Sequence, residues 1–362
     1  MARLLPLALL AACVTSEPAP VGTLQAGIRF AMLPFRNLTA DSDAATRLAD
    51  DLRHLLEQRG ASVAAGTELE DMLRARRIRY TDSLGVEAAR EMARQMAADY
   101  LVLGSLLEYR SSPIPVIALA VRILDGETGA RVHSDVVSLR GDDFVGLLGL
   151  GAITDEKVLA AEVTARIVTG LETWSQPDHG PFDRALLAGF KPPDPLLAYR
   201  REGSRPDELA RVAVLPLTNR TSEPRAGDLL GEILTHQLFQ AARIHVVERA
   251  ELLRALVGEK VRSVDNLDPE VLQRVGRSLG VSHFVLGSVN LLREITLANG
   301  HSVPEIEATV RILDAESGQI VAAAGVRRRG DDYETVLGLG IVRDPVALAT
   351  RLAHEITALV GA

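Results

Sequence analysis

The amino-acid sequence predicts an α/β fold, with two tandem α/β sandwich domains that each hold a mixed sheet. Three features of the 362-residue chain lead to this prediction: the same string of motifs occurs twice, strand-like and helix-like segments alternate within each copy, and a proline-rich stretch separates the copies. A chain of this length suffices for two domains, each with its own hydrophobic core.

The duplication is visible in phrases that recur in the same order. "RFAMLPFRNLT" from Arg29 matches "RVAVLPLTNRT" from Arg211, and "VRILDGETGARV" from Val121 matches "VRILDAESGQIV" from Val310. The offset grows from 182 residues at the first pair to 189 at the second, so the second copy carries a few additional residues. We place most of them between 289 and 305. Repetition on this scale indicates a duplicated domain and not a short solenoid repeat.

Both copies are predicted to have the order β-α-β-α-α-β-β-β-α. Each begins with a strand that is apolar on both faces, at 28–34 and at 212–216, as in a central parallel strand. A helix with leucines on one face follows, then a short strand at 61–65 or 244–247 and two more helices. Three strands and a final amphipathic helix complete each copy, and the turns "DGETG" and "DAESG" predict hairpins between the last two strands. Helices between the first strands and hairpins between the last ones predict a mixed sheet.

A linker is predicted between the copies. Residues 175–210 contain six prolines, and proline at this density interrupts regular structure. We therefore place the first domain at 28–174 and the second at 211–362. Within the linker, the segment "FDRALLAGF" is predicted to dock on one domain as a short helix.

Composition and charge exclude several classes of protein. Lys and Arg number 40 and Asp and Glu number 48, which gives a formal net charge of −8. A general nucleic-acid-binding protein needs a basic face, and a protein held at a membrane surface by charge needs a polybasic segment, so we expect neither. Aromatic residues make up 4% of the chain, which is too few for a base-stacking platform.

The sole cysteine, Cys13, follows a short apolar leader. The basic Arg3 precedes "LLPLALL" and two alanines, which is the layout of a secretory signal. The tetrapeptide "LAAC" resembles the bacterial lipobox, which implies that residues 1–13 are a lipoprotein signal peptide and that Cys13 carries lipid. Val14 follows where inner-membrane lipoproteins have Asp, so the resemblance implies outer-membrane anchoring, with 14–27 as a flexible tether. The alternative is an incidental cysteine in an apolar leader.

Phrases from both copies resemble a known family of envelope proteins. "VAVLPLTNRT", "VGRSLGVSHFVLGSV" and "VRILDAESGQIV" are similar to the TolB amino-terminal domain and its relatives. Those relatives include LpoB-type lipoprotein activators of penicillin-binding proteins, FlgO-like outer-membrane lipoproteins and the curli secretion lipoprotein CsgG. The resemblance implies an α/β fold and a role in binding or assembly. The CsgG pore uses long inserted hairpins, whereas the segments between the predicted strands are short, and this difference disfavours a pore of that kind.

No complete catalytic motif is present in the sequence. The "LGLG" glycines do not extend to GxGxxG, no GxxxxGK occurs, and "HEITA" at His354 lacks the second histidine of a zinc-protease helix. His54 and His236 share a position in the first helix of each copy, away from the leucine stripe, and are predicted to be solvated. We expect no metal, no cofactor and no enzymatic activity.

One repeated phrase invites a functional interpretation: "RGDDFVGLLGLG" and "RGDDYETVLGLG". An arginine before paired carboxylates is interpreted either as a contact for a cation or partner at the sheet edge, or as a polar turn that ends the last strand. The apolar loop that follows packs either on its own domain, or against the other copy or a partner. The candidate partner-contact residues are Arg140, Asp142, Asp143, Leu148, Leu150, Arg329, Asp331, Asp332, Leu337 and Leu339.

These features together predict a lipoprotein on the periplasmic face of the bacterial outer membrane. Its predicted role is that of a non-catalytic binding, assembly or regulatory module of the cell envelope. The expected partners are envelope proteins, with homo-oligomers or pairing of the two repeats as further options, and no nucleic acid. Two alternatives stay open, namely an envelope-tethered hydrolase that uses the paired carboxylates and an oligomeric component of a secretion channel.

Overall fold

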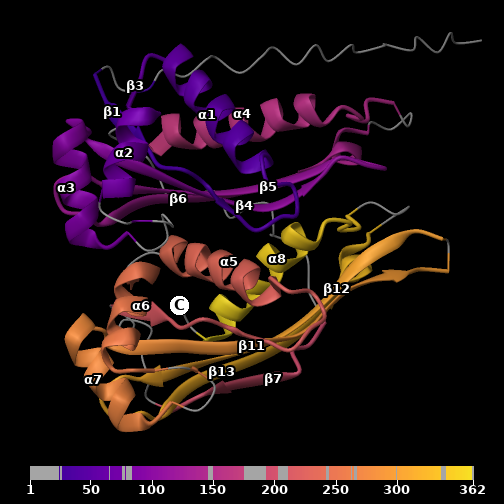
Figure 1. The fold of residues 1–362 in the computed structure, drawn as a ribbon. Coiled ribbons are helices and arrows are strands. Elements are labelled where there is room, and N and C mark those ends of the chain that lie inside the picture. Colours follow the sequence, from indigo (N-terminus) through magenta and orange to yellow (C-terminus); the bar gives the residue numbers. More distant parts are fainter. Residues whose placement is uncertain are drawn as a thin grey trace, which may run out of the picture.

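The computed structural model contains two α/β domains, one for each repeat, and each domain is built on a mixed sheet (Figure 1). The predicted fold class is therefore confirmed. The structure describes residues 24, 27–64, 66–75, 78, 84–145, 150–174, 193–202, 211–241, 244–261, 263–264, 267–298, 300–335 and 340–360.

The first repeat follows the predicted order, with one short strand added after β1. The first strand ends two residues before the predicted boundary, because Pro34 has no N–H to donate to the sheet. The elements are β1 (Arg29–Met32), β2 (Arg36–Asn37), α1 (Ala44–Gln58), β3 (Ser62–Ala64), α2 (Thr67–Ala75), α3 (Val86–Met96), β4 (Tyr100–Arg110), β5 (Val116–Asp125), β6 (Arg131–Arg140) and α4 (Glu156–Trp174).

The second repeat has the same order of elements. Its third helix shows why the sequence signals are reliable locally: Asp268 accepts the N–H of Glu270, Pro269 begins the helix, and Gly280 ends it in the left-handed conformation. The elements are β8 (Arg211–Val214), β9 (Thr218–Asn219), α5 (Ala226–Gln240), β10 (His245–Val246), α6 (Arg249–Gly258), α7 (Pro269–Leu279), β11 (His283–Thr296), β12 (Ser302–Asp314), β13 (Ile320–Arg329) and α8 (Pro345–Val360).

The stretch predicted as a linker contributes a strand. Strand β7 (Leu197–Arg200) pairs antiparallel with β13, with Leu197 opposite Gly325, and covers that edge of the second sheet. The prolines before it do not prevent pairing because they lie outside the strand. The segment "FDRALLAGF", predicted as a short helix, lies outside the described residues.

The two sheets share one topology. The first has the order β3-β1-β4-β5-β6 and the second β10-β8-β11-β12-β13-β7. The first three strands of each are parallel, and the meander that follows is antiparallel. Even an irregularity is shared, since a bulge falls at Leu107 in β4 and at Asn290 in β11. The additional residues of the second repeat lengthen one hairpin, where β11 has 14 residues and β4 has 11.

The repeats stack as four layers, in the order helix, sheet, helix, sheet (Figure 1). Helices α1 and α4 cover the upper face of the first sheet, and α5 and α8 lie between the two sheets. Leu230 and Leu234 of α5 belong to the same hydrophobic cluster as Ala118 and Ala120 of β5, so one core spans the boundary between the repeats. We call the lower face of the first sheet, against α5 and α8, the closed face.

The face of the second sheet that is equivalent to the closed face lies at the end of the stack. Helices α6 and α7 cover only one end of this face, where Leu252 and Val275 pack on Phe284. Across the described residues, the rest of this face has no layer below it (Figure 1). We call it the open face.

Gly141 and Gly330, in the repeated phrase, permit a close approach of two backbone segments. Each glycine begins a 3₁₀ turn after the last strand, and its carbonyl accepts the N–H of a residue further on, Ile153 or Val342, at 2.9 Å. A Cβ on Gly141 would lie 2.0 Å from the Ile153 oxygen, and one on Gly330 would lie 1.9 Å from the Val342 oxygen. Gly141 and Gly330 therefore have a structural role.

We predict that Gly330→Ala destabilises the protein by about 2 kcal/mol or more, because two backbone segments must separate to admit the methyl group. Gly258→Ala is the matched control, since a Cβ at this helical position meets nothing within 4 Å, and its effect is expected to stay within about 1 kcal/mol. Urea denaturation measures both. Equal midpoints for the two variants would contradict the role given to Gly330.

Candidate functional site

The paired carboxylates of the repeated phrase are engaged in turns. The Asp143 side chain accepts the N–H of Arg140 at 2.7 Å, and Asp332 accepts that of Arg329 at 2.7 Å. The other aspartate of the first pair, Asp142, accepts from the Arg140 guanidinium at 2.6 Å. In the second repeat, Asp331 accepts from Arg329 at 3.0 and 2.7 Å. The start of the phrase thus forms a polar turn after β6 and β13, held by hydrogen bonds between its own arginine and aspartates.

In the first repeat this turn also touches the second repeat. Arg140 Nη1 donates to the carbonyl oxygen of Arg343 at 3.3 Å, and the Arg343 guanidinium lies 4.0 Å from Asp142. Of the predicted apolar contacts, Leu150 is 74% exposed. Leu148, Leu337 and Leu339 lie outside the described residues, and the partner contact proposed for all these positions stays a prediction.

The closed face contains a buried ion cluster that the sequence did not indicate. Arg122 Nη1 donates to Glu232 of α5 at 3.0 Å, and its Nε lies 3.3 Å from Glu248. Arg131 donates to Glu248 at 2.8 Å. Burial alone would raise the pKa of Glu248, but Arg131 and Arg122 hold it below its ordinary value. Two arginines of the first repeat therefore meet two carboxylates of the second in an interior where charge must be paired.

The prediction for His236 is wrong. His54 in α1 is exposed, but His236, at the same position in α5, is 8% exposed and lies 3.0 Å from the Ser134 hydroxyl. Burial, followed by the charges of Arg131 and His133, lowers the pKa of His236 to about 3, so the ring is neutral. The leucine stripe of α5 does face its own sheet, and the opposite side of the helix is covered by the other repeat.

A second set of polar contacts joins the two repeats at the start of α8. The Asp344 carboxylate accepts the N–H of Val346 at 3.0 Å and also the Ser138 hydroxyl of the first repeat. Nearby, Arg110 donates to Glu108 at 2.8 Å. Burial, followed by the charge of Asp344, raises the pKa of Glu108 to about 7. The closed face thus holds a carboxyl group that titrates close to neutral pH.

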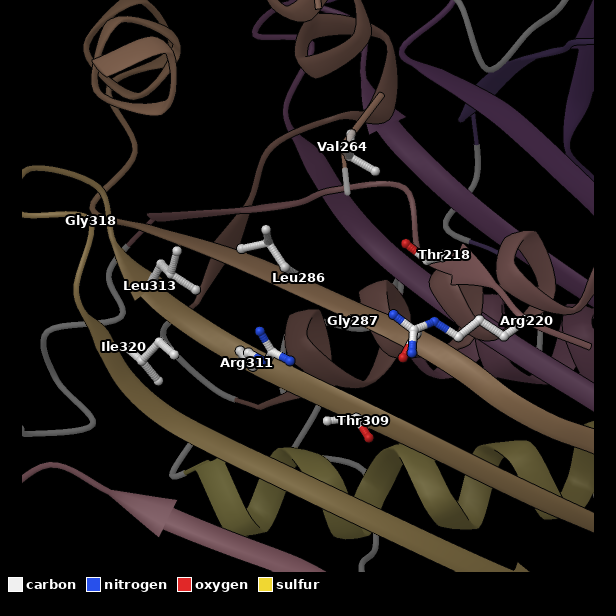
Figure 2. A pocket seen from close by; sticks show the side chains of 11 residues that line it. Thr218, Arg220, Val264, Leu286, Gly287, Thr309, Arg311, Leu313, Gly318 and Ile320 are labelled. Atoms are coloured by element: carbon white, nitrogen blue, oxygen red, sulfur yellow. The ribbon is translucent and has the colours of Figure 1, made fainter. Parts of the chain in front are cut away.

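The open face holds the candidate functional site, a hollow of about 280 Å³. Figure 2 shows Arg220 and Arg311 on this face, with their guanidinium groups over strands β11 and β12 near Gly287. Both arginines are exposed, and within the described part of the chain neither guanidinium has a hydrogen-bonding or ion-pairing partner. Hydroxyl groups also line the hollow, from Thr218, Ser288 and Thr309. Unpaired guanidinium groups beside hydroxyl donors suit a carboxylate or another oxyanion.

The strand register relates this site to the closed face. Arg122 lies opposite Leu103 and Arg311 lies opposite Leu286, both in an "LGS" motif, so the two arginines occupy the same position in their sheets. Arg311 is therefore the counterpart of a residue that binds carboxylates between the repeats.

The positions around these two arginines have diverged. Where the closed face has the apolar Leu107, Ala118 and Ala120, the open face has the polar Asn290, Glu307 and Thr309. Apolar residues fit a face that is permanently covered, and polar residues fit a face that meets water. The open face thus has an arginine at the position that binds carboxylates on the closed face, but polar residues surround it there.

Among the described residues, no three His, Cys, Asp or Glu side chains lie close enough to hold a metal ion. Glu355 of the "HEITA" segment pairs with the buried Arg328 at 2.6 Å and accepts the Tyr333 hydroxyl at 2.8 Å. That carboxylate therefore links the second half of α8 to β13 and to the turn after it.

Comparison with known proteins gives similarities to single-repeat lengths of this chain. No protein-family model and no curated protein sequence matches. Similar solved structures include the PelC dodecamer from Paraburkholderia phytofirmans, with 20% identity over 46% of this chain and 98% of that one, at a TM-score of 0.33. The lipoprotein GNA1162 from Neisseria meningitidis has 14% identity over 39% and 96%, at 0.31. The LpoB C-terminal domain from Salmonella enterica has 21% identity over 32% and 84%, at 0.25.

We predict that Arg122→Ala destabilises the protein by about 3 kcal/mol, because Glu232 and Glu248 lose a buried cation. The duplication supplies the control: Arg311→Ala removes the same side chain from the same sheet position on the open face. Its effect is expected to stay within about 0.5 kcal/mol. Urea denaturation distinguishes the two, and similar losses would show that Arg122 gains nothing from its carboxylate partners.

A pH dependence is predicted from Glu108. Its pKa in the folded chain, about 7, is above the ordinary value of 4.5, so the folded state binds more protons between these values and stability falls as pH rises through them. Glu108→Gln removes this loss, and the variant is expected to gain about 1–2 kcal/mol over the parent at pH 8 relative to pH 5. The exposed Glu127→Gln is the control. A parallel pH profile for Glu108→Gln and the parent would refute the assignment.

Proposed function

We propose that this chain is a lipid-anchored, non-catalytic binding module of the bacterial cell envelope, and that the open face is its contact surface. One observation carries the proposal. The face that binds two helices in the first repeat is without a covering layer in the second, and it presents Arg220 and Arg311 without partners among the described residues. A surface that keeps a charge-binding position free in water is suited to a partner that brings the opposite charge.

The envelope location is proposed from the N-terminal sequence. Cys13 follows small residues at the end of an apolar leader, and acyl chains on this cysteine would anchor the chain. Cys13 lies outside the described residues. Among the helices that are described, none combines the length and the apolar content that crossing a membrane requires.

The geometry of the paired carboxylates supports binding rather than hydrolysis. A general acid or base must reach a substrate proton, whereas Asp142 and Asp143 both accept hydrogen bonds from Arg140, and Asp331 and Asp332 accept them from Arg329. The same turn occurs at the same place in both repeats, as expected for a structural element.

Photo-crosslinking in a Gram-negative host tests the proposal. A benzophenone side chain at Ile320, which is 40% exposed beside the hollow, is expected to form crosslinks that disappear with Arg311→Glu, because the reversed charge repels an anionic partner. The same probe at the exposed Arg94 of α3 is the control and is expected to form none. Cys13→Ser is expected to move the protein from the membrane fraction to the soluble fraction.

Two results would overturn the proposal. Equal crosslinking from both positions would show that the open face is not selective. Crosslinking from Ile320 that persists with Arg311→Glu would show that the charge on this face does not matter. A Cys13→Ser variant that stays in the membrane fraction would overturn the lipid anchor alone.

A further inference from the structure

We propose that the open face binds a second copy of this chain, through the outer side of helix α1 and the start of helix α4 of that copy. This inference rests on the proposed function, for which it names the partner. The stack inside one chain is the template: α5 and α8 of the second repeat lie on the first sheet, and α1 and α4 are their counterparts in the first repeat. If a second copy packs on the second sheet as α5 and α8 pack on the first, its helices α1 and α4 lie on the open face.

The contact between Glu232 of α5 and Arg122 of the closed face has charged counterparts on α1 and on the open face. Helices α1 and α5 both have 15 residues, and Asp50 is the seventh residue of α1 as Glu232 is of α5. Glu232 binds Arg122 on the closed face, and Arg311 is the counterpart of Arg122 on the open face. The same arrangement therefore brings Asp50 of one copy to Arg311 of the other.

The contact at the start of the last helix is also reproduced. Asp344 accepts the N–H of Val346 and the Ser138 hydroxyl, and Asp155 likewise accepts the N–H of the second residue after it, at 2.8 Å, at the start of α4. Ser138 lies opposite Ala118, and Arg327 lies opposite Glu307 at the equivalent place in the second sheet. Asp155 of one copy would face Arg327 of the other, which within its own chain already pairs with Glu305 at 2.6 Å and lies 3.8 Å from Glu307.

A third pair comes from the start of the first helix. Arg225, just before α5, donates to the carbonyl oxygen of Asn37 at 2.6 Å, next to Leu38. Asp43 holds the same place before α1, and Arg220 follows β9 as Leu38 follows β2. The first two of these template contacts thus map to an aspartate on the helices and an arginine on the open face, and the third places Asp43 beside Arg220, the residue that follows the counterpart of Asn37.

Both surfaces are accessible within the described chain. The Asp50 side chain is 59% exposed, with only the neighbouring Arg53 close to it at 3.6 Å. Asp43, Asp155, Arg220 and Arg311 are exposed as well. Because the centre of the open face is polar where the closed face is apolar, the contact between copies depends on charge and is weaker than the contact between repeats. It is also head-to-tail, so it leaves one free face at each end and permits chains to grow.

Sedimentation velocity of the full chain carrying Cys13→Ser, which removes the lipid as a cause of association, tests the inference. At about 20 mM salt the protein is expected to form dimers and longer species as its concentration rises, and at about 300 mM salt to be monomeric. Arg311→Glu and Asp50→Arg are each expected to weaken association at least tenfold. Arg94→Glu and Glu87→Arg, both at exposed positions of α3, are the charge-matched controls and are expected to associate like the parent.

Mixing the Arg311→Glu and Asp50→Arg variants distinguishes a specific contact between these two residues from a general effect of charge on association. The Arg311→Glu chain keeps an intact Asp50, and the Asp50→Arg chain keeps an intact Arg311, so an equimolar mixture regains one native contact and is expected to form heterodimers. A mixture that sediments like its separate components would overturn the inference, as would a parent that stays monomeric at low salt. Crosslinks from Ile320 to a different envelope protein would then leave the proposed function standing, whereas loss of position-selective crosslinks would remove both.

Discussion

The burial of helix α5 between two sheets is the constraint on which the rest of the structure depends. On one side the helix packs its leucines on the second sheet, and on the other side it covers Ala118 and Ala120 of the first. A helix that is apolar on both sides cannot leave either sheet without exposing a hydrophobic face to water. The two repeats therefore share one hydrophobic cluster across their boundary, and α5 and α8 cover the closed face.

That burial also explains the charges inside the boundary. Arg122 and Arg131 of the first repeat require carboxylates once water is excluded, and Glu232 and Glu248 of the second supply them. A buried ion cluster contributes little net stability, but it penalises any shift of one layer along the other, because a displaced charge would be buried without a partner. His236, neutral and next to Ser134, adds a directional contact. We infer that these groups fix how the repeats are placed, while the apolar contacts supply the stability.

Duplication gave this chain two copies of one surface, and among the described residues only one of them is covered. On the open face the apolar positions have become Asn290, Glu307 and Thr309, while an arginine stands at 311 as at 122. Polar residues at the ends of a stack prevent unselective association, as in the terminal repeats of repeat proteins. Binding through the remaining arginines then requires a partner that is correct in charge and position.

The sequence alone determined the fold class, the order of the elements and the existence of two repeats, because these depend on periodicity, turn residues and helix ends that act within a few residues. It left the candidate site open, and it was wrong about His236, because burial depends on which distant surfaces meet. One signal was present in the differences between the copies: α5 has Leu229 and Ile233 where α1 has Arg47 and Asp51. Tertiary structure alone decided that the helices of one repeat cover the sheet of the other, and hence which of two equivalent arginines lacks a partner among the described residues. That choice is made by packing between residues more than 100 positions apart.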